Sequence, residues 1–388
     1  MSATAPPASV RRTGGCWPTR EQTFLLRAAL LAEPEARAAY ASWRETADIE
    51  RVDPASYRIL PLLAHNLGGV DPVLARARGV LRHTWSRNQR LFHEASSAVK
   101  ALQATGIPVM LLKGAALGLR CYESLGHRPM NDVDVLVPPE RSAEARTVLA
   151  RLGWRPSYHV VPGHLPYVHA VGLTIGPGLD LDLHWHAIYE RRRAEDERPF
   201  WENAEPLRGR AIDALAPSPT DLLLQVAAHG LRWSPSPPLQ WAADLVVLLR
   251  AEGARVDWDR LLARAREAGF VLHLGATLSF VHGEFGANVP ADVLSDLRST
   301  RPTGRERLEL AVRSASPGLL PGLVTHWLDF RRVDSTAARG SRLRRFLVYL
   351  ATIWGAPSLA AVPRVALVKS ARRLLRTRRA SHGRTARL

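Results

Sequence analysis

Apolar residues in the first hundred positions recur at helical spacing. One apolar stripe is formed by Phe24, Leu25, Ala28 and Leu31, and a second by Leu60, Leu62, Leu63 and Leu67. Repeats of three and four residues place such side chains on one face of a helix. Asp71 and Pro72 then have the N-cap and first-turn residue types that begin a helix. We expect that helix to be long and to end near Gly106.

The pattern changes to that of strands after Gly106. Residues 107–112 form a short apolar run, and residues 132–137 follow it after room for one short helix. Residues 179–186 alternate without error between apolar and polar positions. Because strand side chains alternate between faces, the polar face of this third strand would carry Asp180, Asp182, His184 and His186.

Helical spacing returns after Pro217 and continues to about Arg332. The predicted fold class is therefore α+β, with a small mixed β-sheet core flanked by N- and C-terminal helical regions. We expect a flexible leader at 1–18, an N-terminal helical region at 19–105, the sheet core at 106–215, a C-terminal helical region at 216–334, and a basic, partly apolar tail at 335–388.

Positive charge is concentrated at the C-terminal end. The 388 residues have a formal net charge of +17 and a pI near 11.0. Residues 335–388 contain no Asp or Glu and supply 13 of the 17 charges, so the remaining chain is only mildly basic. Arginine clusters attract polyanions without sequence selectivity. We expect weak contact of this tail with an anionic polymer or a membrane surface.

The cysteine content and the N-terminal residues indicate the cellular compartment of the protein. Cys16 and Cys121 are too few for a disulfide framework or a zinc knuckle, and the N-terminus lacks a signal sequence. We therefore expect a cytoplasmic protein, peripheral to the membrane if its tail binds lipid.

Residues 346–363 are uncharged, but Gly355, Pro357 and Pro363 interrupt them. A packed helix pair or an interfacial helix is favoured over a spanning helix.

Asp132 and Asp134 form the most informative motif. A strand points both carboxylates to one face, and Mg²⁺ prefers such oxygen ligands. Nucleotidyl transfer needs metal ions that neutralise phosphate oxygens and align attack with departure of pyrophosphate. The same spacing in Asp257-Trp258-Asp259 lacks a strand and a glycine turn, so the context carries the signal. The pair predicts a site for two Mg²⁺ ions beside a nucleoside triphosphate.

A third carboxylate would complete this site. Asp182 is the candidate to bind one ion and to take the proton from an attacking hydroxyl, as a general base does. Asp180 shares the same strand face and stays open as the alternative. We expect Asp132, Asp134 and Asp182 to serve both as catalytic and as metal-binding residues.

The turn before the aspartate pair supplies candidates for nucleotide binding. Gly114 has no side chain, so backbone N–H groups at the start of the following helix could approach the phosphates. Lys113 and Arg128 could offset the remaining phosphate charge. For Lys113 the alternative is a surface position at a strand end. For Arg128 it is pairing with the aspartates, which would hold their geometry.

The order of these motifs resembles the uncharacterised bacterial nucleotidyltransferase family of the polymerase-beta superfamily. The shared pattern is Leu-Lys-Gly, a helix, Arg-x-x-x-Asp-x-Asp, a hydrophobic residue, Leu and Val, then Asp-Leu-His-Trp, within roughly 107–186. The resemblance implies a polymerase-beta-like core in which Asp132 and Asp134 match the metal-binding pair, Asp182 the third carboxylate and Gly114 the glycine of the phosphate-binding turn.

One position departs from that pattern. Ala115 follows the glycine where the wider superfamily usually has serine, so the hydroxyl contact to phosphate is absent and Lys113 is the candidate replacement. The helical segment with Asp221, His229, Trp241 and Asp244 also resembles the family's trailing helices, but its spacing predicts no chemistry.

Two rival functions remain. Histidines beside the aspartates, His184 and His186 with His159, His164 and His169 nearby, could form a transition-metal hydrolase site, although no His-Glu-x-x-His helix supports zinc. The core could also be a catalytically inactive module that binds nucleotides or nucleic acid. The favoured hypothesis is a nucleotidyltransferase that moves an NMP group to a hydroxyl of an unknown acceptor, which could be a small molecule, a peptide or protein, or an RNA end.

We predict that deleting residues 370–388 lowers salt-sensitive adsorption to anionic polymer or anionic lipid vesicles, because arginine charge drives that contact. Triphosphate binding should stay intact. Co-sedimentation at rising salt, beside a nucleotide-binding assay, measures both. Loss of both activities together would contradict the separation of tail and active domain.

Overall fold

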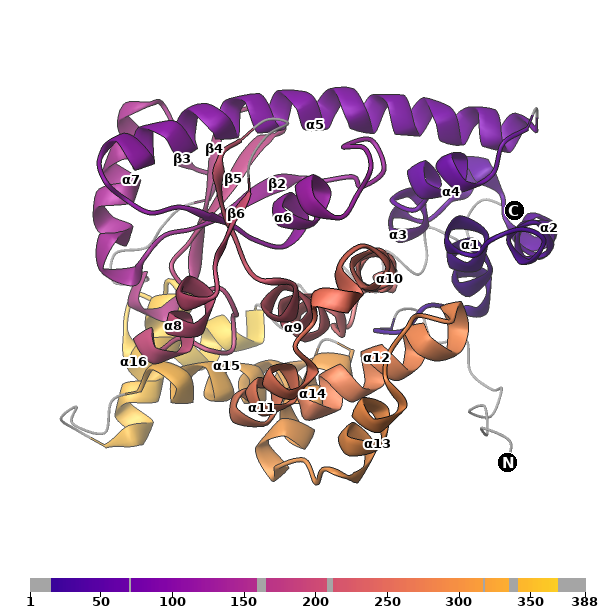
Figure 1. Ribbon diagram of the computed structural model, residues 1–388. Coiled ribbons are helices and arrows are strands. Elements are labelled where there is room, and N and C mark those ends of the chain that lie inside the picture. The colour runs from indigo at the N-terminus through magenta and orange to yellow at the C-terminus, as the bar shows by residue number, and fades with distance from the viewer. Residues whose placement is uncertain are drawn as a thin grey trace.

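The computed structural model describes residues 15–69, 71–158, 165–207, 212–316, 318–334 and 341–368. Within these ranges one mixed sheet lies between helical regions, which confirms the predicted α+β class (Figure 1). Residues 1–14 of the expected leader, and residues 335–340 and 369–388 of the expected tail, lie outside the described residues. His159 and His164 also lie outside them.

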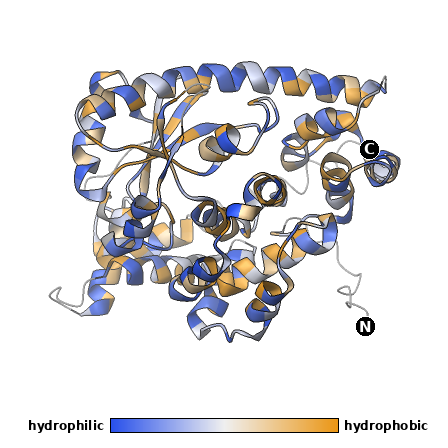
Figure 2. Ribbon diagram, viewed as in Figure 1, coloured by the Kyte–Doolittle hydropathy of each residue, from blue (hydrophilic) through white to orange (hydrophobic). Residues whose placement is uncertain are grey.

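The N-terminal region consists of α1 (Arg20–Leu30), α2 (Glu35–Thr46), α3 (Pro54–Tyr57), α4 (Leu60–Asn66) and α5 (Pro72–Ala104). The predicted start of α5 is confirmed, because the Asp71 side chain accepts a hydrogen bond from the Val73 amide at 2.7 Å. Helix α5 runs along one side of the molecule, from the N-terminal helices to the sheet (Figure 1). Hydrophobic and hydrophilic residues alternate along it (Figure 2), and its apolar face is buried.

The sheet has the strand order β3-β4-β5-β2-β1-β7-β6. Its strands are β1 (Met110–Leu111), β2 (Asp132–Leu136), β3 (Arg155–Pro156), β4 (Ala170–Gly176), β5 (Leu179–His184), β6 (Glu205–Leu207) and β7 (Ala214–Ala216). The central strand β2 runs parallel to β5 and antiparallel to β1. Helix α6 (Lys113–Arg120) connects β1 to β2, and α7 (Ser142–Arg151) and α8 (Ala194–Glu202) also belong to this region.

The register of β2 and β5 determines what each sheet face carries. Asp134 lies opposite Asp182, and Asp132 lies opposite Asp180. The intervening residues, Val133, Val135, Leu181 and Leu183, are fully buried on the other face, where β2 and β5 contact α5. One face of the pair is therefore the core, and the other carries the carboxylates.

The expected strand at 179–186 is wrong at its end. Strand β5 stops at His184, and beyond it the amides of Trp185 and His186 both donate to the single carbonyl of His169, which a regular ladder does not allow. The His186 side chain then meets Glu197, with Nδ1 3.2 Å from Oε1. His186 therefore leaves the polar face that strict alternation would have given it.

Two other boundaries also differ from expectation. Only Met110–Leu111 of the apolar run 107–112 pairs as a strand. Helix α6 begins at Lys113 rather than at Ala115, so the glycine turn forms the first turn of the helix itself.

The C-terminal region contains α9 (Pro219–Gly230), α10 (Gln240–Glu252), α11 (Trp258–Ala268), α12 (Val271–Phe285), α13 (Ala291–Ser299), α14 (Gly304–Ser314), α15 (Leu319–Val333) and α16 (Arg342–Trp354). In the described part of the chain no single helix has the length and apolarity of a membrane span. Helix α16 and Leu359–Val368 pass that test only as a pair, bent by 76°.

We predict that Leu183→Ala lowers the free energy of unfolding by about 3 kcal/mol, because it leaves a cavity between β5 and α5. Leu320→Ala is the control, since Leu320 is 74% exposed and should change stability by less than about 0.5 kcal/mol. Urea denaturation measures both. Equal losses for the two variants would contradict the assigned core.

Candidate active site

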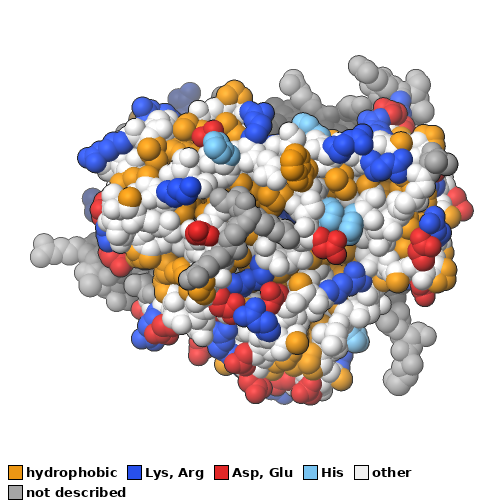
Figure 3. All heavy atoms as spheres, turned by 45° about the horizontal axis from the view of Figure 1, so that its top comes forward, with side chains coloured by type: hydrophobic (Ala, Val, Ile, Leu, Met, Phe, Trp, Pro, Cys, Tyr) orange, Lys and Arg blue, Asp and Glu red, His pale blue; other side chains and the backbone are white. Residues whose placement is uncertain are grey.

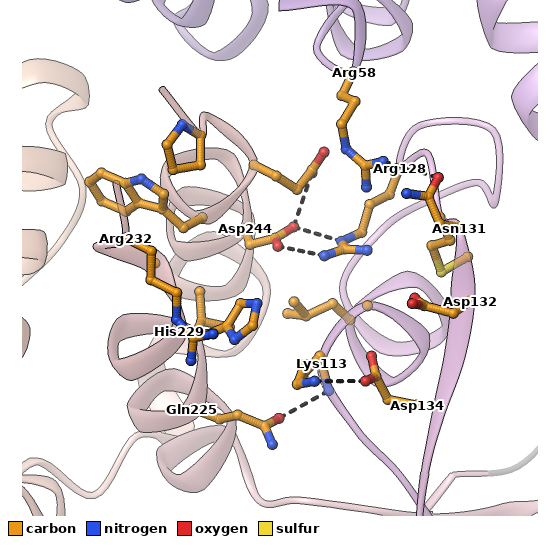
Figure 4. Close-up of a pocket in the computed structure, with 18 of the residues that line it drawn as sticks. Arg58, Lys113, Arg128, Asn131, Asp132, Asp134, Gln225, His229, Arg232 and Asp244 are labelled. Atoms are coloured by element: carbon orange, nitrogen blue, oxygen red, sulfur yellow. Dashed lines mark hydrogen bonds and ion pairs between the residues drawn. The ribbon is translucent and has the colours of Figure 1, made fainter. Parts of the chain in front are cut away.

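A cavity of about 410 Å³ opens beside the polar face of the sheet. The N-terminal region, the sheet core and helices α9 and α10 all contribute to its walls (Figure 4). All six predicted site residues line it: Lys113, Gly114, Arg128, Asp132, Asp134 and Asp182. In the described part of the chain Asp182, and not Asp180, borders the cavity, which favours Asp182 as the third carboxylate.

The acidic side chains are close enough to share a cation. Asp134, Asp182 and His184 each offer one ligand atom, and these atoms all lie within 4.8 Å of one another. Asp132 projects from the same face of β2. Carboxylate oxygens are the ligands that Mg²⁺ takes, so this donor set fits a divalent metal. Imidazole would additionally suit a transition metal.

The carboxylates differ in their electrostatic environment. Burial alone would raise the pKa of Asp134, but the Lys113 ammonium group at 2.7 Å and the His184 imidazole at 2.9 Å outweigh burial and hold that pKa well below its usual range. Burial, followed by repulsion from Asp132 and Asp134, raises the pKa of Asp182 to about 6. Burial and Asp134 also raise the pKa of Asp132. The group therefore holds more negative charge than Lys113 neutralises.

Lys113 occupies a strained backbone position. Its φ of 41° lies in the left-handed region, which costs a residue with a side chain about 1 kcal/mol or more. Its backbone N–H donates to Gln225 Oε1 at 3.0 Å, and Gln225 Nε2 donates to the Ala187 carbonyl at 2.9 Å. Helix α9 thereby holds the turn that aims the Lys113 side chain at Asp134 (Figure 4).

Arg128 pairs with a helix residue instead of the strand aspartates. Its Nε and Nη2 donate to the two carboxylate oxygens of Asp244, on α10, at 2.8 and 2.7 Å. Both side chains are buried, and although burial alone would lower the pKa of Arg128, Asp244 raises it. The Tyr122 hydroxyl also donates to Asp244, at 2.7 Å. This bidentate pair joins α10 to the loop before β2.

Gly114 makes room for that arginine. A Cβ atom built on Gly114 would lie 2.2 Å from Arg128 Nη1. The guanidinium group therefore rests on the first turn of α6, where any side chain would displace it. Gly172 on β4 has a related role, since its Cβ would lie 3.2 Å from Asp182 Oδ1 and 2.6 Å from Ser157 Oγ.

His184 forms a hydrogen bond with Asp134, and no second described histidine joins it at the carboxylates. Burial, and then Lys113, lower the pKa of His184, so we assign a neutral ring whose Nε2–H donates to Asp134. The His169 ring lies 5.1 Å from it, and His186 is turned to Glu197. Among the described histidines, only His184 joins the acidic group.

The sequence analysis assigned no role to several cavity residues, among them Arg58, Gln225 and Asp244. They lie far from the aspartate motif in sequence, and no local spacing connects them to it. One signal was available, because Asp244 is the one charged residue in the apolar stretch Trp241–Leu249. A carboxylate buried in such a helix needs a cationic partner.

We predict that Gly114→Ala destabilises the protein by about 1–3 kcal/mol, because the methyl group would displace Arg128 from Asp244. Gly79→Ala in α5 is the matched control. No atom lies within 4 Å of its Cβ position, so it should stabilise the helix by about 0.5–1 kcal/mol. Equilibrium denaturation reports both changes, and a neutral Gly114→Ala would contradict the close approach.

Comparisons with known proteins indicate a nucleotidyltransferase family. The profile of an uncharacterised nucleotidyltransferase family matches residues 54–286. No curated protein matches the chain. Two solved structures are similar: the antibiotic-resistance factor ANT(2'')-Ia and a CCA-adding enzyme in complex with ATP.

Both structural similarities are distant. The ANT(2'')-Ia match has 17% identity and a TM-score of 0.32, and covers 51% of this chain and 99% of that one. The CCA-adding enzyme match has 14% identity and a TM-score of 0.21, and covers 75% and 85%. Similarities of this size carry no argument about substrate. The family profile, however, spans more than half of the sequence, and the chain therefore belongs to the uncharacterised nucleotidyltransferase family.

Proposed function

We propose that this nucleotidyltransferase moves an NMP group from a magnesium-bound nucleoside triphosphate to an acceptor hydroxyl. One observation carries the proposal. Asp132 and Asp134 on β2 and Asp182 on the adjacent parallel strand β5 line a single cavity, with Lys113 at the start of α6 on the same cavity wall. Neighbouring carboxylates beside a cation and a helix N-terminus suit a metal triphosphate.

Asp132, Asp134 and Asp182 would hold two Mg²⁺ ions. Bound there, the ions would supply the charge that neutralises the phosphate oxygens and aligns the attacking and leaving groups. The protein's own contribution is to hold the three carboxylates in register across two strands. His184 fixes the orientation of the Asp134 carboxylate through its hydrogen bond.

The transfer exchanges one P–O bond for another. The acceptor oxygen bonds to the α-phosphorus, and the bond from that phosphorus to the α,β-bridging oxygen breaks, which releases pyrophosphate. Asp182 takes the hydroxyl proton. Lys113 and Arg128 offset phosphate charge, and the first turn of α6 at Gly114 presents backbone N–H groups to the phosphates.

The acceptor is a hydroxyl on a small molecule, a peptide or protein, or an RNA end. We further propose that the protein lies in the cytoplasm and that its basic tail contacts an anionic surface. A second candidate, a transition-metal hydrolase, draws support from His184, whose ring offers a nitrogen within 4.8 Å of a carboxylate oxygen of Asp134 and of Asp182. Zinc-dependent hydrolysis without label transfer would favour it.

We predict that Asp132→Asn and Asp182→Asn each lower NMP transfer at least about a hundredfold, because each removes a ligand charge from the reacting phosphates. Asp180→Asn is the matched control. It removes a charge from the same strand as Asp182 but outside the cavity wall, so it should keep most activity. Transfer from α-labelled triphosphates measures all three, and full activity in Asp132→Asn would refute the assignment.

Wild-type protein should also be stabilised thermally by at least one of the four nucleoside triphosphates, and only when magnesium is present. The shift follows from binding to the folded state alone. Chelation by EDTA should abolish it. Stabilisation that is the same with and without magnesium would point instead to an inert binding module.

A further inference from the structure

Arg58 reaches the cavity from outside the sheet core. It follows α3 in the N-terminal helical region and points toward Arg128 and Asn131 (Figure 4). Arg58 Nη2 donates to the Pro129 carbonyl at 2.6 Å, and Nη1 donates to Asn131 Oδ1 at 3.4 Å. Both partners are neutral, and both lie within three residues of Asp132. The guanidinium group is thereby fixed beside the first metal-binding carboxylate.

The other cations of the cavity each have a carboxylate partner. Lys113 pairs with Asp134, and Arg128 pairs with Asp244. Arg232 lies 3.6 Å from a Glu190 oxygen. Among the residues that the structure describes, Arg58 is the one cavity-lining cation with no carboxylate at ion-pair distance. Its charge is therefore available to an anion that enters the cavity.

Arg58 is surrounded by charges of both signs. Burial, and then the neighbouring Arg128, lower its pKa, whereas Asp244 and Asp132 raise it. A guanidinium group stays protonated under these conditions, so like charges are held together at some cost. Lys and Arg side chains are also spread over the surface that α5 crosses (Figure 3). An anion at Arg58 would offset the repulsion between Arg58 and Arg128.

We propose that Arg58 forms a polyphosphate subsite, which binds the β- and γ-phosphates of the triphosphate and then the pyrophosphate product. The inference rests on the proposed function and assigns one of its contacts. The planar guanidinium fork matches two phosphate oxygens, which a lysine cannot do. Arg128 is less suited to this contact, because the Asp244 carboxylate already offsets its charge, whereas the partners of Arg58 are neutral and leave one N–H free on each of its Nη atoms. The N-terminal helical region thus completes the nucleotide site.

A merely structural role would be to tie α3 to the loop before β2 through the Pro129 carbonyl. Such a role predicts lower stability for an Arg58 variant but no selective loss of phosphate binding. The polyphosphate role predicts a selective loss of phosphate binding in the Arg58 variant. Inorganic tripolyphosphate with magnesium separates the two, because it contains the phosphate chain without base or sugar.

The experiment is calorimetric titration of the full-length chain with magnesium tripolyphosphate. Arg58→Gln should weaken binding about tenfold, the loss of one charge-assisted contact. Arg51→Gln is the matched control. It removes the same charge from the same region, but Arg51 is 78% exposed and pairs only with Asp48 in the structure described. Its affinity should equal that of wild type, and the unfolding midpoint of each variant is measured alongside.

Arg58→Lys keeps the charge but loses the fork, so its affinity should fall between those of wild type and Arg58→Gln. This variant also decides the question if Arg58→Gln fails to fold, since wild-type affinity in Arg58→Lys would overturn the subsite. Equal affinity of wild type and Arg58→Gln would overturn it as well. Label transfer by wild type shows whether the proposed function stands in either case. Wild-type protein that neither transfers label nor binds tripolyphosphate would remove both.

Discussion

The parallel, in-register pairing of β2 with β5 is the constraint on which the site depends. It sets Asp134 opposite Asp182 and Asp132 opposite Asp180, so acidic side chains gather on one face while the opposite face is buried on α5. A slip of one residue would turn these carboxylates into the core. The pairing therefore couples the hydrophobic stability of the sheet to the position of the charges. It also creates a concentration of negative charge that the one lysine at Asp134 does not balance.

Two arginines connect the carboxylate site on the sheet to the helical regions. Arg128 binds Asp244 of α10 with two hydrogen bonds, and Arg58 brings the N-terminal helices to the loop before Asp132. Removing either partner of the buried pair would leave an uncompensated charge, which costs about 3–5 kcal/mol. The cavity thus consists of three parts of the chain that are distant in sequence. Gly114 permits this arrangement because its missing side chain leaves space for the arginine.

The sequence predicted the local parts of this structure well. The α+β class, the start of α5 and the carboxylate strand follow from periodicities and capping residues that act over a few positions. All six predicted site residues line one cavity. The end of β5 was missed because it depends on a residue distant in sequence, His169, whose one carbonyl accepts from the amides of both Trp185 and His186. Arg58 and the partner of Arg128 depend on long-range packing, which no local pattern encodes. Only the isolated charge of Asp244 within an apolar helix hinted at the pair.

The central claim is that the three aspartates share metal ions beside a bound triphosphate. The most direct measurement is a crystal structure of the protein with Mn²⁺ and a non-hydrolysable nucleoside triphosphate, in which anomalous scattering locates the metal. The account predicts Mn²⁺ within about 2.0–2.3 Å of carboxylate oxygens from both β2 and β5, and in contact with the phosphate chain. Metal and nucleotide bound away from Asp132, Asp134 and Asp182, or held by residues of one strand alone, would contradict it.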